Sequence, residues 1–416
     1  MPGFRVHVCT AVLLLAAFCA PAAAEAPPDP SWEFSWWPKL ELKRSDDAHR
    51  VRLGGRALFD GAAIHYGDGL VNRNGPPGWN VEAEVRQGRI GIQGHFFHHL
   101  EFKTEVDFAA TDPDPGLTDA YIGLRQLGPV SFIRFGHQKV PFSFESEMSR
   151  RWLVFMERSL ANSLDSTSRD VGVRIQGNAL EKRLLWIVGG YRATEATGRA
   201  FTDPTNWVVA GRVSGLPYWA DEGRRLLHLG GSYTHGFRSA DPSNSFRERA
   251  RPEANLADNL IDTGDIAGVD AVNRIEVDFV WVHGPFSMQG EYAHAFLNRS
   301  TGAGNLDFVA YYAHANWFVT GEHRVYNRDR GIFGAVKPHE NFDPAEGGWG
   351  ALQLGLRVSY NDLNDRDVSG GRETDLTLGA NWFLNPFLRL TFNWVHGWVA
   401  SEDEVDVLQG RIQIVY

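Results

Sequence analysis

Cysteine is almost missing from this sequence. The chain of 416 residues has two cysteines, Cys9 and Cys19, and both lie within residues 1–24. This segment has the pattern of a secretory signal peptide, with an apolar stretch over 12–20 and small residues over 22–24. We predict cleavage after Ala24, so the exported chain would have no disulfide, no thiol nucleophile and no cysteine-bound metal.

Long apolar runs and an excess of basic residues are also lacking. After residue 24, no uncharged apolar run approaches the ~20 residues of a membrane-spanning helix, which excludes a helical membrane protein. Lys and Arg number 41 against 51 Asp and Glu, and this acidic balance argues against a general nucleic-acid binder. Aromatic residues are abundant (14 Trp, 11 Tyr, 26 Phe), and a hydrophobic fraction of 43% suffices for a folded core.

The clearest pattern that is present is an alternation with a period of two residues. In 100–108, Leu100, Phe102, Val106 and Phe108 would share one face of a strand, and charged residues would occupy the other face. Similar alternation recurs at 171–176, 275–281, 352–360 and 375–382. The sequence therefore predicts an all-β protein whose strands have one apolar and one polar face.

Sixteen segments are candidate strands: 51–61, 81–97, 100–109, 118–126, 130–138, 170–178, 183–192, 206–213, 226–237, 274–282, 285–297, 308–320, 351–361, 373–384, 387–399 and 405–416. Their lengths centre near the ~9–11 residues of a tilted strand that crosses a bilayer. Several connections are tight turns, whereas 62–80, 139–169, 193–205 and 238–273 are long and polar. Short turns on one side and long loops on the other are typical of an outer-membrane β-barrel.

A soluble sandwich or a large secreted barrel would also have alternating strands. The membrane barrel is favoured by charges of both signs on the polar faces and by aromatic residues near strand ends, as at Trp394 and Trp398. The last strand ends on Tyr416, which resembles the signal read by the barrel-insertion machinery of bacterial outer membranes. We therefore predict a signal peptide over 1–24, an N-terminal segment over 25–50 and a transmembrane antiparallel β-barrel over 51–416, in the cell outer membrane of a Gram-negative bacterium.

One stretch does not fit the pattern of short and long connections. Residues 321–350 are long, yet they fall on the side of the short turns. Either this turn is elaborated, or Leu40–Lys43 is a further strand and another strand assignment is wrong. An even and large number of strands is the safer form of the prediction.

Several segments also stand in a characteristic order: Leu53-Gly54-Gly55-Arg56 with Asp60, Arg86–Gly91, Phe102–Phe108, Asp119–Ile122, Gly136–Phe142, Glu157-Arg158-Ser159, Phe318–Arg324 and Asn381–Pro386. Together they resemble the phosphate-selective porin O and P family, over essentially all of 39–416. The resemblance implies a sixteen-stranded, homotrimeric outer-membrane channel for anions. It also implies a long third loop that folds into the lumen.

A channel for anions needs fixed basic donors at its constriction, because an ion in a narrow pore gives up part of its hydration. Arginine suits phosphate because its planar fork can donate two parallel hydrogen bonds. The candidate constriction is the loop 139–169, with Lys139, Arg150, Arg151 and Arg158. In the family, basic residues at the start and in the middle of this loop face the anion, and Lys139 and Arg151 match these places.

On the barrel wall, the candidates are Arg56, Arg86 and Arg89. Family members often have Arg-Arg-x-Arg here, so Gln87 replaces one arginine by a neutral donor. By strand parity, Arg86 and Arg89 face opposite sides unless Gly88 marks a bulge. We expect Arg89 to face the lumen.

Each basic candidate also has a structural interpretation. Lys139 could be a solvated charge at the rim, and Arg150 or Arg151 could pair with Glu145 or Glu147 within the loop. The inward arginines of the wall could form a ladder or could neutralise inward carboxylates in a structural network. These arginines are 52, 56, 125, 174 and 357.

The sequence offers no persuasive catalytic constellation. Ser232 and His228 would lie on one face of a strand, but four residues apart they are too distant for a histidine to activate the serine. The histidines show no ligand spacing with carboxylates. We expect no enzymatic activity, no cofactor and no metal site.

The sequence thus predicts a passive outer-membrane porin for small anions, with inorganic phosphate or polyphosphate as candidate solutes. Its expected partners are these anions, outer-membrane lipid and the barrel-insertion machinery, and not nucleic acid. The alternatives are a porin for another small solute, or a barrel plugged by its own loops that serves adhesion or envelope structure.

Overall fold

The computed structural model describes residues 31–36, 40–70, 78–109, 116–165, 169–194, 206–238, 245–300, 302–400 and 403–416. The predicted signal peptide, with both cysteines, lies outside these described residues. Within the described ranges, no helix has the length and apolar composition to cross a membrane.

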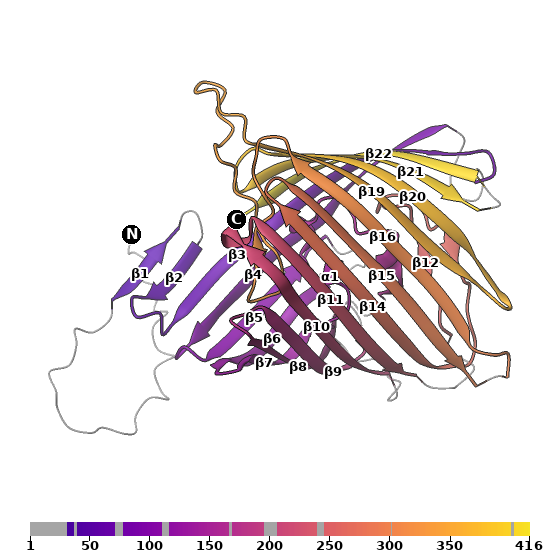
Figure 1. Ribbon diagram of the computed structural model, residues 1–416, viewed down its shortest axis with the longest axis horizontal. Coiled ribbons are helices and arrows are strands. Elements are labelled where there is room, and N and C mark those ends of the chain that lie inside the picture. Colours follow the sequence, from indigo (N-terminus) through magenta and orange to yellow (C-terminus); the bar gives the residue numbers. More distant parts are fainter. Residues whose placement is uncertain are drawn as a thin grey trace, which may run out of the picture.

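An 18-stranded antiparallel sheet forms the molecule, and sixteen of its strands close into a barrel, as predicted (Figure 1). The barrel strands are β3 (Arg50–Tyr66), β4 (Trp79–Phe96), β5 (Leu100–Asp107), β6 (Gly116–Leu127), β7 (Val130–Lys139), β8 (Arg169–Ala179), β9 (Leu184–Arg192), β10 (Trp207–Ala220), β11 (Arg225–Phe237), β14 (Val269–His283), β15 (Phe286–Arg299), β16 (Leu306–Phe318), β19 (Ala351–Asp365), β20 (Val368–Phe383), β21 (Leu388–Val399) and β22 (Asp403–Val415). Each strand pairs with its neighbours in chain order, and β22 pairs back with β3 from Val405 opposite Tyr66 to Val415 opposite Arg56. Closure leaves the barrel without a free strand edge.

The other two strands of the sheet explain the stretch that did not fit. β1 (Trp32–Ser35) and β2 (Leu40–Arg44) extend β3 beyond the barrel, at the end where the C terminus lies (Figure 1). The turn between β16 and β19 is elaborated as well, with β17 (Tyr326–Asn327) and β18 (Ile332–Phe333). Leu40–Lys43 is therefore a further strand and the turn is long, yet none of the sixteen strand assignments is wrong.

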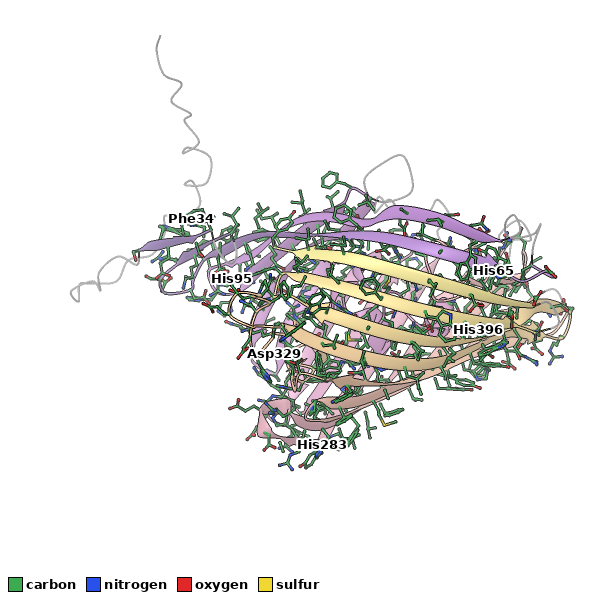
Figure 2. All side chains as sticks on the ribbon, turned by 90° about the horizontal axis from the view of Figure 1, so that it is seen from above. Phe34, His65, His95, His283, Asp329 and His396 are labelled. Carbon is green, nitrogen blue, oxygen red and sulfur yellow. The ribbon has the colours of Figure 1, made fainter. Side chains whose placement is uncertain are left out.

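The two faces of the barrel strands differ as the alternation predicted. On β14, Val277 and Trp281 are exposed on the outer face, whereas Glu276 and Asp278 are buried inside the barrel. In Figure 2, Phe34 and His95 lie toward one end of the barrel, and His65 and His396 lie toward the other. The end with Phe34 has most of the tight turns and, by the pattern of outer-membrane barrels, faces the periplasm.

Three connections fold into the barrel. The third loop, described over 140–165, joins β7 to β8 and contains α1 (Phe144–Glu147) and the 3-10 helices η1 (Arg150–Trp152) and η2 (Leu160–Leu164). The fifth loop, described over 245–268, joins β11 to β14 and contains β12 (Arg249–Ala250) and β13 (Ile261–Asp262). The turn between β16 and β19 (319–350, the inner turn) enters from the periplasmic end with its first part, which includes the buried Arg324, Tyr326 and Phe333, whereas 337–347 are largely exposed. A further 3-10 helix, η3 (Asp221–Gly223), lies in the turn between β10 and β11.

Apolar side chains of these connections pack against the barrel wall. Phe144 of the third loop and Phe333 of the inner turn share a buried cluster with Leu226 and Val280 of the wall. Leu160 of the third loop and Ile261 of the fifth loop belong to a larger cluster nearer the extracellular end. The infolded third loop that the family resemblance implied is thus confirmed, and it is joined by two further infolded segments.

Candidate pore-lining site

Two of the predicted anion-binding residues brace the third loop from within. Lys139 donates through Nζ to three carbonyl oxygens, those of Ser146, Glu147 (3.0 Å) and Met148 (2.9 Å). An ammonium group has three donors, so Lys139 has none left for an anion in this geometry. The C-terminal carbonyls of α1 thereby gain a cation that satisfies them.

Arg158 has a similar place on the other side of α1. Its Nε donates to the carbonyl oxygen of Glu145 (3.0 Å), and its Nη2 donates to that of Met148 (3.2 Å). The short helix is further capped at its N-terminus by Ser143, whose side chain accepts from the backbone N–H of Ser146. The guanidinium of Arg158 therefore holds the loop's shape, and Lys139 does the same.

Glu157 is the point where the third loop meets the arginines of the barrel wall. Arg86 donates to both of its oxygens (2.9 and 3.1 Å), and Arg411 of β22, on the other side of β3, donates at 2.8 Å. Arg150 lies 3.2 Å away, so the partner of Arg150 is Glu157 rather than Glu145 or Glu147. Arg411 also forms a fork with Asp60. Glu157 thus binds Arg86 and Arg150 together with Arg411, and its single negative charge offsets part of theirs.

Arg86 faces the lumen because β4 contains a β-bulge. Leu58 of β3 pairs with Gln87, and the next residue of β3 pairs with Val85, so Arg86 is an extra residue on β4. A bulge reverses the strand parity, and both Arg86 and Arg89 therefore point inward. The sequence had anticipated a bulge only at Gly88; the structure places it at Arg86.

Arg56 and Arg89 point into the lumen and are engaged with neighbours on the wall. Arg89 donates to Asp107 (2.7 Å) and Glu105 (3.2 Å), and Arg56 donates to Gln87 (2.8 Å) and Glu105 (3.3 Å). Glu105 is thus shared by two arginines. Gln87, the neutral replacement, acts here as an acceptor for Arg56.

Arg151 differs from all these basic residues because it has no ion pair among the described residues. Its guanidinium lies over the ring of Trp152, 4.8 Å from the ring centroid, and its buried Nε has no hydrogen-bond partner in the described part of the chain. Burial lowers the pKa of Arg151; Glu105 opposes this, and the charges of Arg330 and Arg89 add to it. Arg151 therefore has a positive charge without an ion-pair partner in the described structure, and it lies within the electrostatic field of Glu105 and Arg89.

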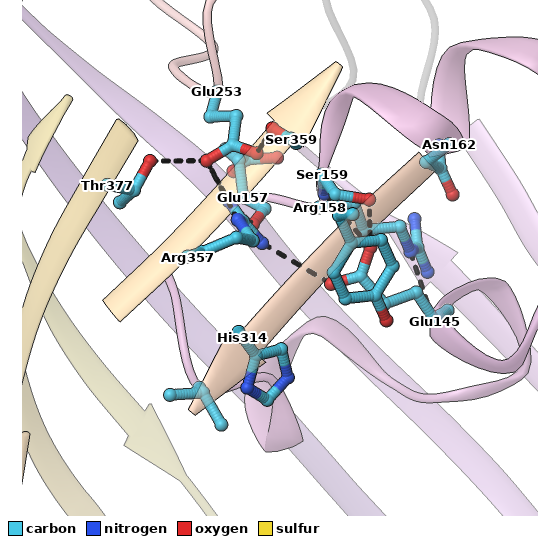
Figure 3. A network of polar contacts seen from close by, with 12 residues as sticks. Glu145, Glu157, Arg158, Ser159, Asn162, Glu253, His314, Arg357, Ser359 and Thr377 are labelled. Carbon is cyan, nitrogen blue, oxygen red and sulfur yellow. Dashed lines mark hydrogen bonds and ion pairs between the residues drawn. The ribbon is translucent and has the colours of Figure 1, made fainter. Parts of the chain in front are cut away.

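Arg357 fastens the third and fifth loops to the wall (Figure 3). Its Nε donates to Glu253 of the fifth loop at 2.8 Å, its Nη1 to Glu145 at 3.4 Å, and its Nη2 to the carbonyl oxygen of Glu157 at 3.1 Å. Ser359 and Thr377 also donate to Glu253. Sequence parity placed Arg357 inward, but its partners lie in loops far away in the chain, and no local signal pointed to Glu253.

Paired glycines on the wall make room for the third loop. Gly355 of β19 and Gly379 of β20 lie opposite each other in register. A Cβ at Gly379 would lie 3.0 Å from the ring of Phe155, and one at Gly355 would meet the same ring at 3.0 Å. The missing side chains thus form the seat of Phe155, which stacks below Arg357 at 4.4 Å.

The more exposed of the inward arginines and lysines lie on one side of the lumen. On β3 to β8, the side chains of Arg52, Lys103, Arg134 and Arg169 are 20–28% exposed, whereas those of Arg56, Arg89 and Arg174 are 6–8% exposed. On β10 to β22, those of Arg212, Arg274, Arg357 and Arg411 are only 1–4% exposed. The three infolded segments therefore cover the inward charges of the second half of the barrel more completely than those of β3 to β8.

The residues considered for catalysis do not meet. Ser232 Oγ lies 2.7 Å from Glu276, whereas His228 lies 2.7 Å from Asp278 and 2.6 Å from the hydroxyl of Tyr326. In the described ranges, no group of three or more His, Cys, Asp or Glu is arranged to hold a metal ion. The pair Ser232–Glu276 and the group of His228, Asp278 and Tyr326 belong to the buried polar network of the lumen.

A closed antiparallel barrel with an apolar outer face, a charged lumen and an infolded third loop defines the class of outer-membrane porins. The chain belongs to the family described as phosphate-selective porin O and P, whose model matches residues 60–416. It is therefore a channel protein of the Gram-negative outer membrane.

Individual proteins are similar to this chain in sequence or in fold. Porin O of Pseudomonas aeruginosa is 24% identical over 415 residues, which cover 91% of each chain. A loop-deletion form of OmpT, an outer membrane protein of Vibrio cholerae, is similar in fold, with a TM-score of 0.57 and 13% identity over 89% of this chain and 100% of that one. In-vitro folded OmpT in its trimer form has a TM-score of 0.54 and 12% identity, with coverage of 89% and 100%.

Proposed function

We propose that this porin favours small anions, inorganic phosphate among them, and that Arg151 at the third loop makes the selection. The observation that carries the proposal is that Arg151 alone among the loop's predicted basic residues has neither a carboxylate nor a carbonyl partner for its guanidinium in the described structure. A fixed cation without a partner attracts anions and repels cations at a constriction.

The wall opposite Arg151 supports this selection. Around Glu105, the basic residues are Arg56, Arg89, Lys103 and Arg169, and the acidic residues are Glu105, Asp107 and Asp119. With Arg151, five positive charges stand against three negative ones, so the local charge is +2 although the whole chain is acidic. The local field at the constriction decides ion preference, and the net charge of the chain does not.

Phosphate or polyphosphate as the solute is the finer part of the proposal. It is supported by the description of the family and by the fork geometry of arginine, which matches phosphate oxygens. Lys139 is not part of the proposed anion contacts, since its donors are engaged within the loop. Arg86, Arg150 and Arg158 would act by positioning the loop.

We further propose that the porin acts as a homotrimer without enzymatic activity. Membership in a porin family supports a channel rather than an enzyme, and OmpT, which shares the fold, has a trimer form. Outer-membrane lipid and the barrel-insertion machinery, which would read the strand ending at Tyr416, are the other proposed partners. Light scattering of the detergent-solubilised protein would give a mass of one or three barrels and so test the trimer.

The test of selectivity is the zero-current potential of the refolded porin in a planar bilayer under a salt gradient. We expect anion preference for the wild type and a weaker one for Arg151→Ala. Two unit charges ~4 Å apart interact by ~1 kcal/mol in water and more at lower dielectric, so the permeability ratio should fall at least about fivefold.

Arg150→Ala is the matched control, because it removes the same charge from the adjacent position. Glu157 would remain bound to Arg86 and Arg411, so the permeability ratio should change less than in Arg151→Ala. Cation preference of the wild type would refute the proposal, and equal effects of the two substitutions would refute the role of Arg151. Absence of conductance in well-folded protein would favour the alternative of a barrel plugged by its infolded segments.

A further inference from the structure

The strands β1 and β2, which we call the N-terminal arm, extend the sheet past the end of the barrel wall. β22 ends at Tyr416, whose backbone pairs with Gly55 of β3, and β2 takes over the same edge of β3 beyond this point. Phe34 aligns across β2 with Val51 of β3, which lies about 13 Å beyond Gly55 at ~3.3 Å per residue. Figure 2 shows Phe34 on this arm, beyond the periplasmic end of the barrel.

One face of the arm is apolar and exposed. Trp32, Phe34 and Trp36, which alternate along the chain, are 55%, 66% and 76% exposed, and Leu40 and Leu42 of β2 are each 40% exposed. An aromatic side chain has a surface of ~150–250 Å², so these three aromatic residues alone expose about 400 Å². A contiguous apolar patch of this size marks an interaction site.

The other face of the arm is charged, and its charges are paired within the sheet. Lys43 binds Glu33 at 2.9 Å, and the Nε of Arg52 in β3 donates to Glu41 at 2.8 Å. A charged partner would therefore have to break these pairs. The apolar face is the part of the arm that needs a cover.

The outer wall of the barrel next to the arm contains glycines that the chain itself does not require. Gly61 of β3, Gly88 of β4 and Gly410 of β22 lie on the outer face, because residues two positions away on each strand are exposed. A Cβ would come no closer to another atom than 3.8 Å at Gly61, 3.9 Å at Gly88 and 3.5 Å at Gly410, and none of these three glycines has a positive φ. Small residues within a membrane let two protein surfaces approach closely, so this wall is suited to contact with another protein.

The arm and this wall form one continuous surface, since Phe34, Leu42 and Val51 stand in one row across β1, β2 and β3. A second barrel can cover both parts, because it spans the membrane and reaches its periplasmic edge. Lipid chains end at that edge, and a soluble protein does not reach glycines within the membrane. We propose that the apolar face of the N-terminal arm packs against the outer wall of an adjacent copy of this chain.

The area is consistent with such a contact. An arm that buries about 400 Å² of aromatic surface covers a similar area of its partner, and specific interfaces bury ~1,200–2,000 Å² in total. The wall around the three glycines would supply the remainder. In a closed ring each copy gives one arm and receives one. The proposal rests on the homotrimer proposed above and identifies a surface that holds it together.

The experiment places the photoreactive amino acid benzoylphenylalanine at position 34 of the exported chain. The refolded protein is reconstituted into vesicles of phosphatidylethanolamine and phosphatidylglycerol, which leave a second copy and lipid as the available partners. Irradiation should cross-link the barrels into dimers and trimers that persist on a denaturing gel. The same amino acid at position 237 is the matched control and should give lipid adducts only. Phe237 is 48% exposed on β11, halfway round the ring of sixteen strands from β3.

Light scattering of the same samples in detergent separates this proposal from that of the homotrimer. Trimers without protein cross-links from position 34, or with lipid adducts alone, would overturn the role of the arm and leave the homotrimer standing. Monomeric barrels would overturn both proposals.

A double variant tests the energetic role of the arm. Trp32→Ser/Phe34→Ser should raise the protein concentration at which half of the barrels are trimeric by about tenfold or more, the effect of exposing a large apolar side chain. Phe237→Ser should dissociate like the wild type, and heat modifiability checks that each variant is a folded barrel. Equal dissociation of Trp32→Ser/Phe34→Ser and the wild type would contradict the proposal.

Discussion

Replacement of Arg357 by methionine should release two infolded loops at once. Arg357 is 1% exposed and contacts Glu253, Glu145 and the carbonyl oxygen of Glu157. Methionine is of similar length and keeps contact with the ring of Phe155, but it leaves the carboxylate of Glu253 without its cation. The substitution therefore removes charge compensation from a buried site with little change in packing.

The size of the effect follows from burial. Glu253 would keep the hydrogen bonds from Ser359 and Thr377, but an uncompensated buried charge typically costs ~3–5 kcal/mol when its partner is removed. The matched control is Arg372→Met on β20, which breaks an exposed ion pair with Asp362 at 2.9 Å. An exposed pair contributes at most ~1 kcal/mol.

Two measurements test this expectation. Urea unfolding of the refolded barrel should show a lower free energy of unfolding for Arg357→Met and little change for Arg372→Met. Single-channel recordings should show a larger or noisier conductance for Arg357→Met, since the third and fifth loops lose their common anchor.

The double variant Arg357→Met/Glu253→Gln sharpens the test. It removes the buried charge together with its partner, so it should recover part of the stability that Arg357→Met loses. Equal stabilities of Arg357→Met and Arg372→Met, together with unchanged conductance, would refute the assignment of Arg357 as the anchor of the loops.

Three further predictions concern the same infolded segments. Phe333→Ala in the inner turn should cost ~3–5 kcal/mol, as large aromatic truncations in cores do, and it should raise conductance from the periplasmic side; unchanged recordings would show that the turn does not obstruct the path. Gly379→Leu should displace Phe155 from its seat, which a fluorescent label on the third loop would report as a shifted emission. Gly190→Leu on β9 should not, because an added side chain there meets nothing within 4 Å. Burial would raise the pKa of Glu157, but Arg86, Arg150 and Arg411 outweigh it and hold the pKa well below its usual 4.5. Because the pKa of Glu157 is lowered in the folded loop, its ionised form stabilises the loop above pH 4.5, and this stabilisation is lost as the pH falls through the folded-state pKa. Conductance should therefore stay constant from neutral pH to 4.5 and change only below it. Glu157→Gln should show the low-pH behaviour at every pH.

Much of the barrel could be predicted because its strands are specified locally. The alternation in 100–108 and its counterparts reports which side chains face lipid and which face the lumen, and period-two patterns survive in a single sequence. The connections were harder. The strand at Leu40–Lys43 and the elaborated turn at 321–350 both exist, but the alternation alone could not show that β2 lies outside the closed ring.

The candidate site was predictable only as a set of residue types. The sequence by itself determined that basic residues gather in the third loop and on β4, and it favoured Arg89 over Arg86 as the residue that faces inward. Only the tertiary structure decided which of these charges are engaged. Lys139 and Arg158 bind carbonyls of α1, Arg86 and Arg150 bind Glu157, and Arg151 has no such partner.

Neither the bulge at Arg86 nor the contact between Arg357 and Glu253 could be predicted from the sequence, and the reason is the same for both. A bulge depends on how one strand pairs with the next, and an ion pair between residues 104 positions apart in the chain depends on closure of the whole barrel. Hydrogen-bond register and charge compensation are properties of neighbours in space. The sequence determines the faces of each strand, and the closed barrel determines which charges on those faces meet.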